Sequence, residues 1–377
     1  MTMYLDHAAT TTMRPEAWEA FEAAAHSLDR NASGQHAEAR KAKNALEEAR
    51  ERAATLLGME RPHDIVFTGS GTEADNLAII GASLASGRRS VAVSAIEHDA
   101  VLNAARSLER FDFSVDLVPA SRSGVVDLDA IGAAAASKPA VLSVMTGNNE
   151  VGVIQPIARI VEIVRRVDRE ILVHTDAIQA FNSEDVSLEE TGADLVSLSS
   201  HKFGGPKGVG LLAVRKGVRL EPIIHGGGQE AGRRAGTYNV AGIVAMVAAM
   251  ETAAADRASF KNRIGAERDV FESAVLAGHP GAKVTARTTE RLPHISHIRF
   301  PGILAETFLI RLDQAGIAAA AGSACQSGAV EPSHVLTAMG FSDIAAGEFV
   351  RFSFGWDTPQ GEGWRAARSV LDVLGAL

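Results

Sequence analysis

The chain has 377 residues, of which 46% are hydrophobic and only 5% aromatic, and its formal net charge is -9. This length exceeds what one small core organises, so we expect two lobes in a folded chain. The negative charge disfavours a nucleic-acid-binding surface. The single cysteine excludes an internal disulfide and fits residence in the cytoplasm.

Neither the first residues nor the longest apolar stretch of the chain indicates a membrane segment. The first residues, 1–12, lack the basic stretch and apolar run of a signal peptide. The longest apolar stretch, Val240–Ala255, is rich in alanine, is interrupted by Gly242 and is too short to span a bilayer. We therefore expect a protein that does not enter the membrane.

Helical and strand patterns alternate over the first two thirds of the chain. One helical pattern begins at Pro15, and a second runs from His36 to Leu57 and stops at Gly58. The alternation that follows predicts a largely parallel sheet covered by helices on both faces. The expected strands are Asp64–Thr68, Ser90–Ser94, Val115–Val118, Val141–Met145, Ile171–Thr175, Leu195–Leu198 and Gly210–Val214.

The pattern changes after Asn239. A long helical stretch with a few small interruptions runs to about Ala277 and joins the first lobe to a smaller α/β lobe. Before a terminal helix, the smaller lobe is expected to contain strand Ile295–Phe300, helix Ala305–Ala315, strand Ile317–Ala320, helix Ser333–Met339 and strand Phe349–Phe354.

Two of the strands in the first lobe are followed by polar residues that suit a ligand. The turn Thr68–Glu73 opens a helix, so its backbone N–H groups would face an anion such as a phosphate; an ordinary tight turn is an equal alternative. Asp176 closes another strand and can hold a protonated ring nitrogen, while Gln179 can donate to an oxygen. Taken alone, Asp176 is more typical of a helix cap.

Lys202 changes this balance. It follows a further strand in the segment Ser197–Pro206, beside a histidine and two serines, where an amine is well placed to form a Schiff base. A surface lysine is the usual alternative, and the flanking Ser-Ser-His and Gly-Gly-Pro make it less favoured here.

Three further segments add weaker signals. His98 can lie flat against a planar ring, or be a core histidine or a helix cap. Asn148–Glu150 offers amide donors, although such turns are common. The glycine-rich segment His225–Gln229 leads to Thr237, which can reach a phosphate, and a flexible surface loop is the alternative.

Cys325 is bracketed by Gly, Ser and Gln. Single cysteines are most often small buried hydrophobes, but those lie in apolar runs. The segment Gly322–Gly328 instead indicates an exposed, mobile loop, which suits a reactive thiol.

Ten short blocks carry a family resemblance, and in this order they run nearly end to end. They are Tyr4–Thr11, Asn31–His36, Thr72–Asn76, Glu97–His98, Asn148–Gly152, His174–Asp176, Ser200–Lys202, His225–Gly228, Gly322–Cys325 and Arg351–Gly355. The chain resembles the cysteine desulfurases of the nitrogen-fixation and iron–sulfur-cluster type, within the class V aminotransferase superfamily.

The resemblance implies an aspartate-aminotransferase-like α/β fold. Its large domain, 15–250, would bind pyridoxal 5'-phosphate and contain a mainly parallel seven-stranded sheet covered by helices. A smaller C-terminal α/β domain, made of 1–14 and 251–377, would carry the catalytic cysteine loop.

The resemblance also implies a role for each site residue. Lys202 would bind the cofactor covalently, His98 would stack on its ring and move protons, and Asp176 would pair with the ring nitrogen. Asn31, Asn149 and Arg351 would bind the substrate, with Arg351 and Asn31 holding its carboxylate, and Cys325 would accept the sulfur as a persulfide. The other cofactor contacts would be Asn149 and Gln179 near the ring hydroxyl, and Gly71, Thr72, Ser199, Ser200, His201 and the partner subunit's Thr237 around the phosphate.

The implied activity is removal of sulfur from L-cysteine, giving L-alanine, for iron–sulfur cluster assembly or nitrogen fixation. The implied partners are a sulfur-accepting scaffold protein and a second copy of the chain. No intrinsic metal is expected, beyond transient contact of Cys325 with an iron–sulfur cluster. A selenocysteine lyase or another class V pyridoxal-phosphate enzyme is the alternative.

Three positions depart from the family pattern. The order Gly69-Ser70-Gly71 is unusual and bears on phosphate contact, and Ala231 replaces a residue that is charged in many members, which bears on the subunit interface. Gln326 follows the cysteine in place of the more usual Thr or Ser.

Overall fold

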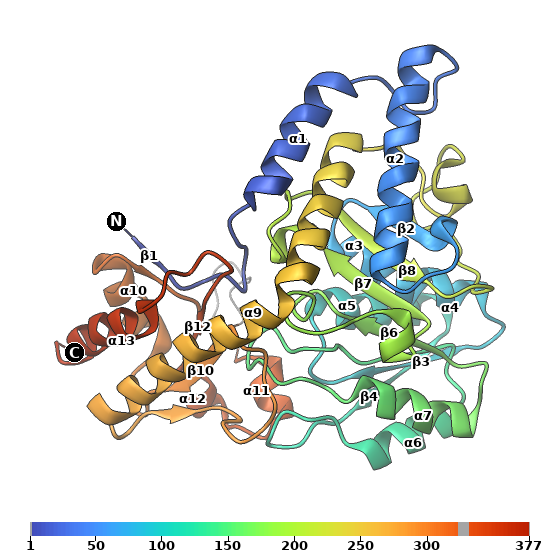
Figure 1. Cartoon of the computed structure of the whole chain (residues 1–377). Helices are drawn as coiled ribbons and strands as arrows, with labels where there is room; N and C mark the ends of the chain where they lie inside the picture. Colours follow the sequence, from blue (N-terminus) through green and yellow to red (C-terminus); the bar gives the residue numbers. More distant parts are fainter. Residues whose placement is uncertain (1, 323–331, 377) are drawn as a thin grey trace.

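The computed structural model describes residues 2–322 and 332–376. Its larger sheet has seven strands in the order β2-β8-β7-β6-β5-β3-β4 (Figure 1). The strands are β2 (Ile65–Thr68), β3 (Ser90–Ser94), β4 (Ser114–Val118), β5 (Val141–Ser143), β6 (Leu172–Asp176), β7 (Leu195–Ser199) and β8 (Gly210–Val214). The predicted mainly parallel sheet is confirmed. Only β8 runs antiparallel to its neighbours, and the sequence gives no signal for that reversal.

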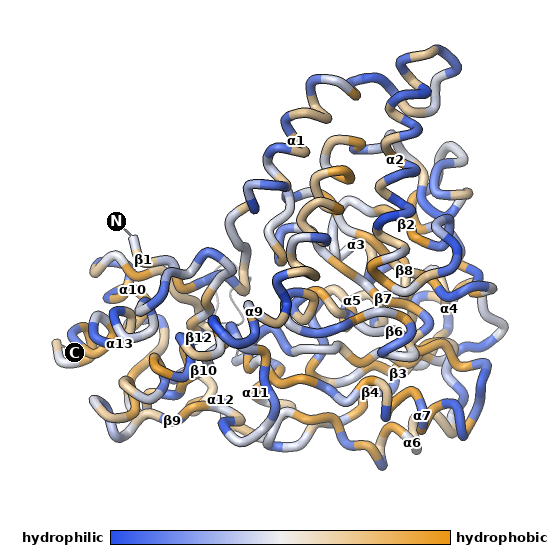
Figure 2. The backbone as a smooth tube through the Cα atoms, viewed as in Figure 1, coloured by the Kyte–Doolittle hydropathy of each residue, from blue (hydrophilic) through white to orange (hydrophobic). Residues whose placement is uncertain are grey.

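Alternate residues of each strand face opposite layers of helices. On β2, Ile65 and Phe67 pack with α2 (Ala37–Leu56) and α9 (Val240–Gly278), whereas Val66 packs with α3 (Gly71–Asn76) on the other face. Figure 2 shows hydrophobic stretches along these strands and hydrophilic ones along much of α2. Three polar positions on β5, β6 and β7 are therefore buried on the α3 face: Ser143, His174 and Ser197.

Helix α9 joins the two parts of the molecule (Figure 1). It is one continuous helix of 39 residues, so the predicted small interruptions are wrong. Its packing against α1 (Pro15–Ser27), α2 and α13 (Glu362–Leu374) offsets the low helix propensity of its glycines.

Two small sheets form the second part. β12 (Phe349–Ser353), β10 (Ile295–Arg299) and β9 (Lys283–Val284) are antiparallel, and β1 (Met3–Tyr4) pairs in parallel with β11 (Ile317–Ala318). The start of the chain thus joins the C-terminal part. The division of the chain into domains at residues 14 and 250 stays a prediction.

The remaining elements are short or connect the strands. They are η1 (Pro62–Asp64), η2 (Leu77–Gly81), α4 (Ala82–Ala85), α5 (Asp99–Ser107), η3 (Leu108–Phe111), α6 (Leu128–Ala136), α7 (Ile157–Val167), α8 (Leu188–Thr191), η4 (Ser200–Lys202), η5 (Gln229–Gly232), α10 (Ala305–Gln314), α11 (His334–Ala338) and α12 (Asp343–Ala346). No helix among the described residues is both long and apolar enough to cross a membrane.

Candidate active site

Most of the predicted cofactor residues gather where parallel strands end. The carboxyl ends of β3, β5, β6 and β7 lie at one edge of the sheet and lead to His98, Asn149, Asp176 and Lys202. This edge is where open α/β sheets bind ligands.

Lys202 ends the short helix η4 after β7. Its Nζ donates hydrogen bonds to the carbonyls of Ala8 (2.6 Å) and Ala9 (2.8 Å). Gln179 Nε2 donates to the same Ala8 oxygen at 2.8 Å. The lysine and the glutamine, which follow different strands, therefore converge on residues 4–14, a segment that we call the N-terminal strap.

Asp176 is a buried acid whose pKa responds to the charge of this lysine. Burial raises the pKa of Asp176, whereas His98, the N–H of Ile178 (2.9 Å) and Lys202 all lower it. His98 itself caps α5, since its Nδ1 accepts from Ala100 N at 3.1 Å, and its ring is exposed. The structure thus brings Lys202, Asp176 and His98 together.

A buried polar cluster lies behind Asp176 on the α3 face. His174 contacts Ser143 Oγ (2.8 Å) and Ser197 Oγ (2.9 Å), and its Nε2 is 3.6 Å from Asp75 Oδ1. Burial lowers the pKa of His174 to about 3, and burial together with Asp176 raises the pKa of Asp75. Nothing in the residue pattern singles out Asp75, because a charged residue inside a helix usually faces water.

Glu97 extends this cluster. Its Oε1 accepts from Ser94 Oγ and Met145 N, both at 2.7 Å, and its Oε2 has no hydrogen-bond partner in the described part of the chain. Burial, opposed by the Ser94 bond and reinforced by Asp176, raises the pKa of Glu97 to about 8. Of Asp75, Glu97 and Asp176, only Asp176 has its pKa lowered by nearby basic side chains, His98 and Lys202.

Replacing Glu97 with glutamine is expected to change how stability depends on pH. Between about pH 4.5 and 8 the unfolded chain releases a proton that folded Glu97 keeps, so the free energy of unfolding falls as pH rises. The Glu97→Gln variant lacks this loss, and it should gain on the order of a few kcal/mol over the parent between pH 5 and 8. Urea unfolding of both cofactor-free proteins at the two pH values measures this, and equal differences at both would contradict it.

The side chains of Ser199 and Ile178 pack closely against the backbone of the turn before α3. A Cβ at Gly71 would lie 2.8 Å from Ser199 Cβ and 2.4 Å from Ile178 Cδ1, and the Ser199 contact cannot be relieved by rotating a side chain, so the position favours glycine. The Gly71 N–H points to Ser199 Oγ (3.4 Å), and Thr72 is exposed. Ser200 Oγ is buried without a hydrogen-bond partner among residues 2–322 and 332–376. An unpaired hydroxyl beside a helix start fits the phosphate of the predicted cofactor.

Arg351 projects from β12 and is only 3% exposed. Its Nη1 donates to Asn149 O (2.7 Å) and its Nη2 to Asp6 Oδ1 (2.9 Å). Its buried Nε has no hydrogen-bond partner among the described residues. A carboxylate bound by this guanidinium would have to share or replace the contacts with Asn149 and Asp6.

Four further residues were predicted to belong to the site: His201, Asn31, Thr237 and Cys325. His201 lies beside Lys202, contacts Thr10 Oγ1 at 3.1 Å, and has its pKa lowered to about 4 by burial and by Lys202 and Lys207. Asn31 and Thr237 are exposed, and neither forms a hydrogen bond with Lys202, Asp176 or His98 within the described part of one chain. Cys325 lies outside the described residues.

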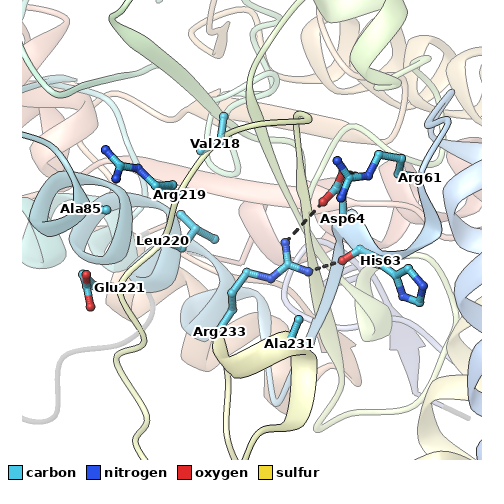
Figure 3. A pocket seen from close by; sticks show the side chains of 10 residues that line it. All are labelled: Arg61, His63, Asp64, Ala85, Val218, Arg219, Leu220, Glu221, Ala231 and Arg233. Atoms are coloured by element: carbon cyan, nitrogen blue, oxygen red, sulfur yellow. Dashed lines mark hydrogen bonds and ion pairs between the residues drawn. The ribbon is translucent and has the colours of Figure 1, made fainter.

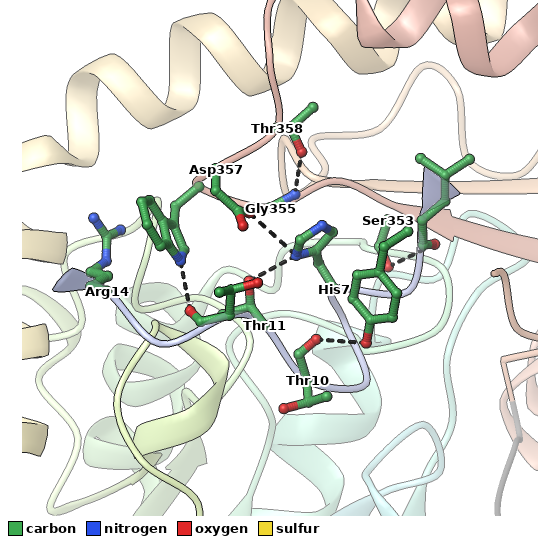
Figure 4. Close-up of polar contacts among 12 residues, drawn as sticks. His7, Thr10, Thr11, Arg14, Ser353, Gly355, Asp357 and Thr358 are labelled. Atoms are coloured by element: carbon green, nitrogen blue, oxygen red, sulfur yellow. Dashed lines mark hydrogen bonds and ion pairs between the residues drawn. The ribbon is translucent and has the colours of Figure 1, made fainter. Parts of the chain in front are cut away.

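The N-terminal strap is held by contacts within itself and by one from the C-terminal part of the chain (Figure 4). His7 Nδ1 contacts Thr11 Oγ1 at 2.8 Å, Tyr4 Oη donates to Thr10 O at 3.0 Å, and Trp356 Nε1 donates to Thr12 O at 2.9 Å. Sequence reasoning quoted part of this segment for its resemblance but assigned it no role. Its contribution is through backbone carbonyls, which leave no signature in residue type.

A separate surface pocket surrounds Arg233, away from the strand ends (Figure 3). Arg233 contacts Asp64 Oδ1 (3.6 Å) and the carbonyl of His63, and Ala231 lies beside it. Ala231, which departs from the family pattern, is thus exposed and lines this pocket.

Known proteins resemble this chain over nearly its whole length. The family Aminotransferase class-V matches residues 3–362. Cysteine desulfurase IscS of Dictyoglomus turgidum is 39% identical, over 99% of this chain and 93% of that protein. Cysteine desulfurase NifS of Azotobacter vinelandii is 38% identical, over 100% and 93%. A solved NifS-like protein is 33% identical, with a TM-score of 0.93 and full coverage of both chains.

The fold and the family match over residues 3–362 are those of the class V aminotransferases, a class of pyridoxal-phosphate enzymes. Within that class, the chain belongs to the cysteine desulfurase family.

Proposed function

We propose that this enzyme removes sulfur from L-cysteine with the help of pyridoxal 5'-phosphate, releasing L-alanine and leaving a persulfide on Cys325. The observation that carries the proposal is the convergence of Lys202, Asp176 and His98 at one sheet edge, together with the buried fork of Arg351. The names of the relatives support the same reaction.

The residues around this edge suit the cofactor. Asp176 would pair with its ring nitrogen, His98 would cover its ring, and Asn149 and Gln179 would lie near its hydroxyl. Its phosphate would lie among Gly71, Thr72, Ser199, Ser200, His201 and the partner subunit's Thr237. When bound, the cofactor supplies an electron sink that stabilises negative charge on the substrate.

Lys202 and His98 are the groups proposed to move protons. The carbonyls of Ala8 and Ala9 accept hydrogen bonds from Lys202 Nζ and hold it at the sheet edge. His98 lies exposed at the same edge, with its Nδ1 engaged by the backbone, so its Nε2 can exchange a proton with the substrate.

Arg351 and Asn31 are proposed to bind the substrate carboxylate. The planar guanidinium of Arg351 suits a two-oxygen group, which would share or replace its contacts with Asn149 and Asp6. Asn31 is exposed in the described chain, so its contribution requires a neighbouring surface to meet the site.

The Cys325 thiolate is proposed to attack the sulfur of bound cysteine. A sulfur–sulfur bond forms and the carbon–sulfur bond of the substrate breaks. The substrate carbon takes up a proton and leaves as alanine, and the enzyme keeps the sulfur as a persulfide. No external oxidant is consumed, because the electron pair of the broken carbon–sulfur bond stays on the substrate carbon, which is reduced as the transferred sulfur is oxidised.

The persulfide needs an acceptor, and we propose a scaffold protein for iron–sulfur clusters, in general assembly or in nitrogen fixation. The enzyme would act as a homodimer in the cytoplasm, with Thr237 completing the neighbouring phosphate site.

Mass spectrometry after addition of L-cysteine tests the proposal. We expect the mass of one extra sulfur on the Cys325 peptide, together with an equal amount of L-alanine. Alanine without the added sulfur, or sulfur on another residue, would contradict the role of Cys325.

A further inference from the structure

The segment 225–238, which we call the Thr237 loop, has a strained backbone. Glu230 and Ala231 are consecutive non-glycine residues with left-handed φ angles of 50° and 55°. Glu230 is buried, and its carboxylate accepts two hydrogen bonds from Arg50, at 2.7 Å and 2.9 Å. Tyr238 Oη accepts from Glu230 N at 2.9 Å. The loop is therefore held in one conformation at this point.

A second fastening joins the loop to the predicted phosphate turn. Arg234 Nε donates to Glu73 Oε1 at 2.7 Å, and its Nη2 donates to Oε2 at 3.2 Å. The two side chains are 21% and 15% exposed, so water screens this pair only in part.

Glu73 also shapes the turn itself. Its Oε2 accepts from Gly69 N at 2.7 Å, and its N–H donates to Ser70 Oγ at 3.1 Å. One carboxylate oxygen thus accepts both from the turn that precedes Thr72 and from the loop that carries Thr237. A displacement of either donor shifts an acceptor that the other shares.

We propose that the Glu73–Arg234 pair is a positioning bridge that serves two cofactor sites at once. Through Glu73 it shapes the phosphate turn of its own subunit, and through Arg234 it fixes the loop that presents Thr237 to the partner subunit's site. The inference rests on the proposed function, because it requires Thr237 to complete the neighbouring site.

Mixed dimers separate the two roles of the bridge. In each dimer one chain carries Lys202→Ala, so only the other chain binds the cofactor covalently. Arg234→Met is then placed either in the chain with the intact lysine or in the Lys202→Ala chain. The readout is the rate at which the visible absorption of the bound cofactor is lost after transfer to cofactor-free buffer, which does not depend on desulfurase activity.

We expect Arg234→Met to speed cofactor loss about fivefold in both placements, a modest effect for coupled sites. Glu73→Gln, which weakens the same pair from the other side, should act in the same two placements. Arg219→Met is the matched control and should change neither, because Arg219 is exposed, lies outside the Thr237 loop and makes no hydrogen bond to Glu73 in the described part of the chain (Figure 3).

An effect of both bridge variants in only one placement would overturn the proposal, and so would no effect in either. Thr237→Ala in the Lys202→Ala chain distinguishes the causes. If that variant is also silent, the proposed exchange of Thr237 between subunits is wrong. If it speeds cofactor loss while Arg234→Met in the same chain does not, only the bridge is wrong. Circular dichroism of each dimer verifies that the variants fold.

Discussion

Replacing Lys202 with alanine is expected to lower turnover of L-cysteine by about 10³-fold or more, within the range attributed to a positioned acid or base together with loss of covalent cofactor binding. The structure gives the reason, because Nζ of this residue is the amine held beside Asp176 and His98 by the carbonyls of Ala8 and Ala9. Alanine production per enzyme, measured with saturating cofactor, checks the expectation.

Lys207→Ala is the matched control for this variant. Lys207 is an exposed lysine five positions along the same segment, and its loss should leave turnover within about twofold, as expected for a surface substitution. Comparable turnover by the Lys202→Ala enzyme and the parent would remove Lys202 from the chemistry, whatever the state of the fold.

Replacing Cys325 with alanine should lower sulfide release from L-cysteine by about 10³-fold, equivalent to about 4 kcal/mol of transition-state stabilisation. The cofactor should nevertheless remain bound, because no proposed cofactor contact involves this thiol. Sulfide release in the presence of a reducing thiol, together with the visible spectrum, measures both expectations.

Ser327→Ala serves as the control for Cys325, since it changes a neighbouring residue and keeps the thiol. A Cys325→Ala enzyme that releases sulfide at the parent rate would show that the sulfur leaves by another route. Such a result would favour a lyase that needs no protein nucleophile.

Much of the fold was predictable, because hydrophobic strands alternate with helical patterns in a way that only a covered parallel sheet satisfies. The same reasoning placed Asp176 and Lys202 at one edge, since parallel strands end together. The reversal of β8 was not predictable, because strand direction depends on connections and not on residue pattern.

Contacts between residues far apart in the sequence could not be predicted either. The pairing of Asp6 with Arg351 spans 345 positions, and nothing local to either residue indicates the other. Asp75 and Glu97 carry carboxylates, which usually lie at the surface, yet both side chains are fully buried. The backbone oxygens of Ala8 and Ala9 are invisible to any argument from side-chain type.

The N-terminal strap has a consequence for biosynthesis. Its position depends on Ser353, whose N–H donates to Leu5 O at 2.7 Å and whose Oγ accepts from Ala8 N at 2.9 Å. Ser353 is translated about 150 residues after Lys202, a delay of roughly eight to thirty seconds at ordinary ribosome speeds. A nascent chain can therefore complete its large sheet while the surroundings of its lysine are still unfinished, and cofactor loading should wait until the last strand has left the ribosome.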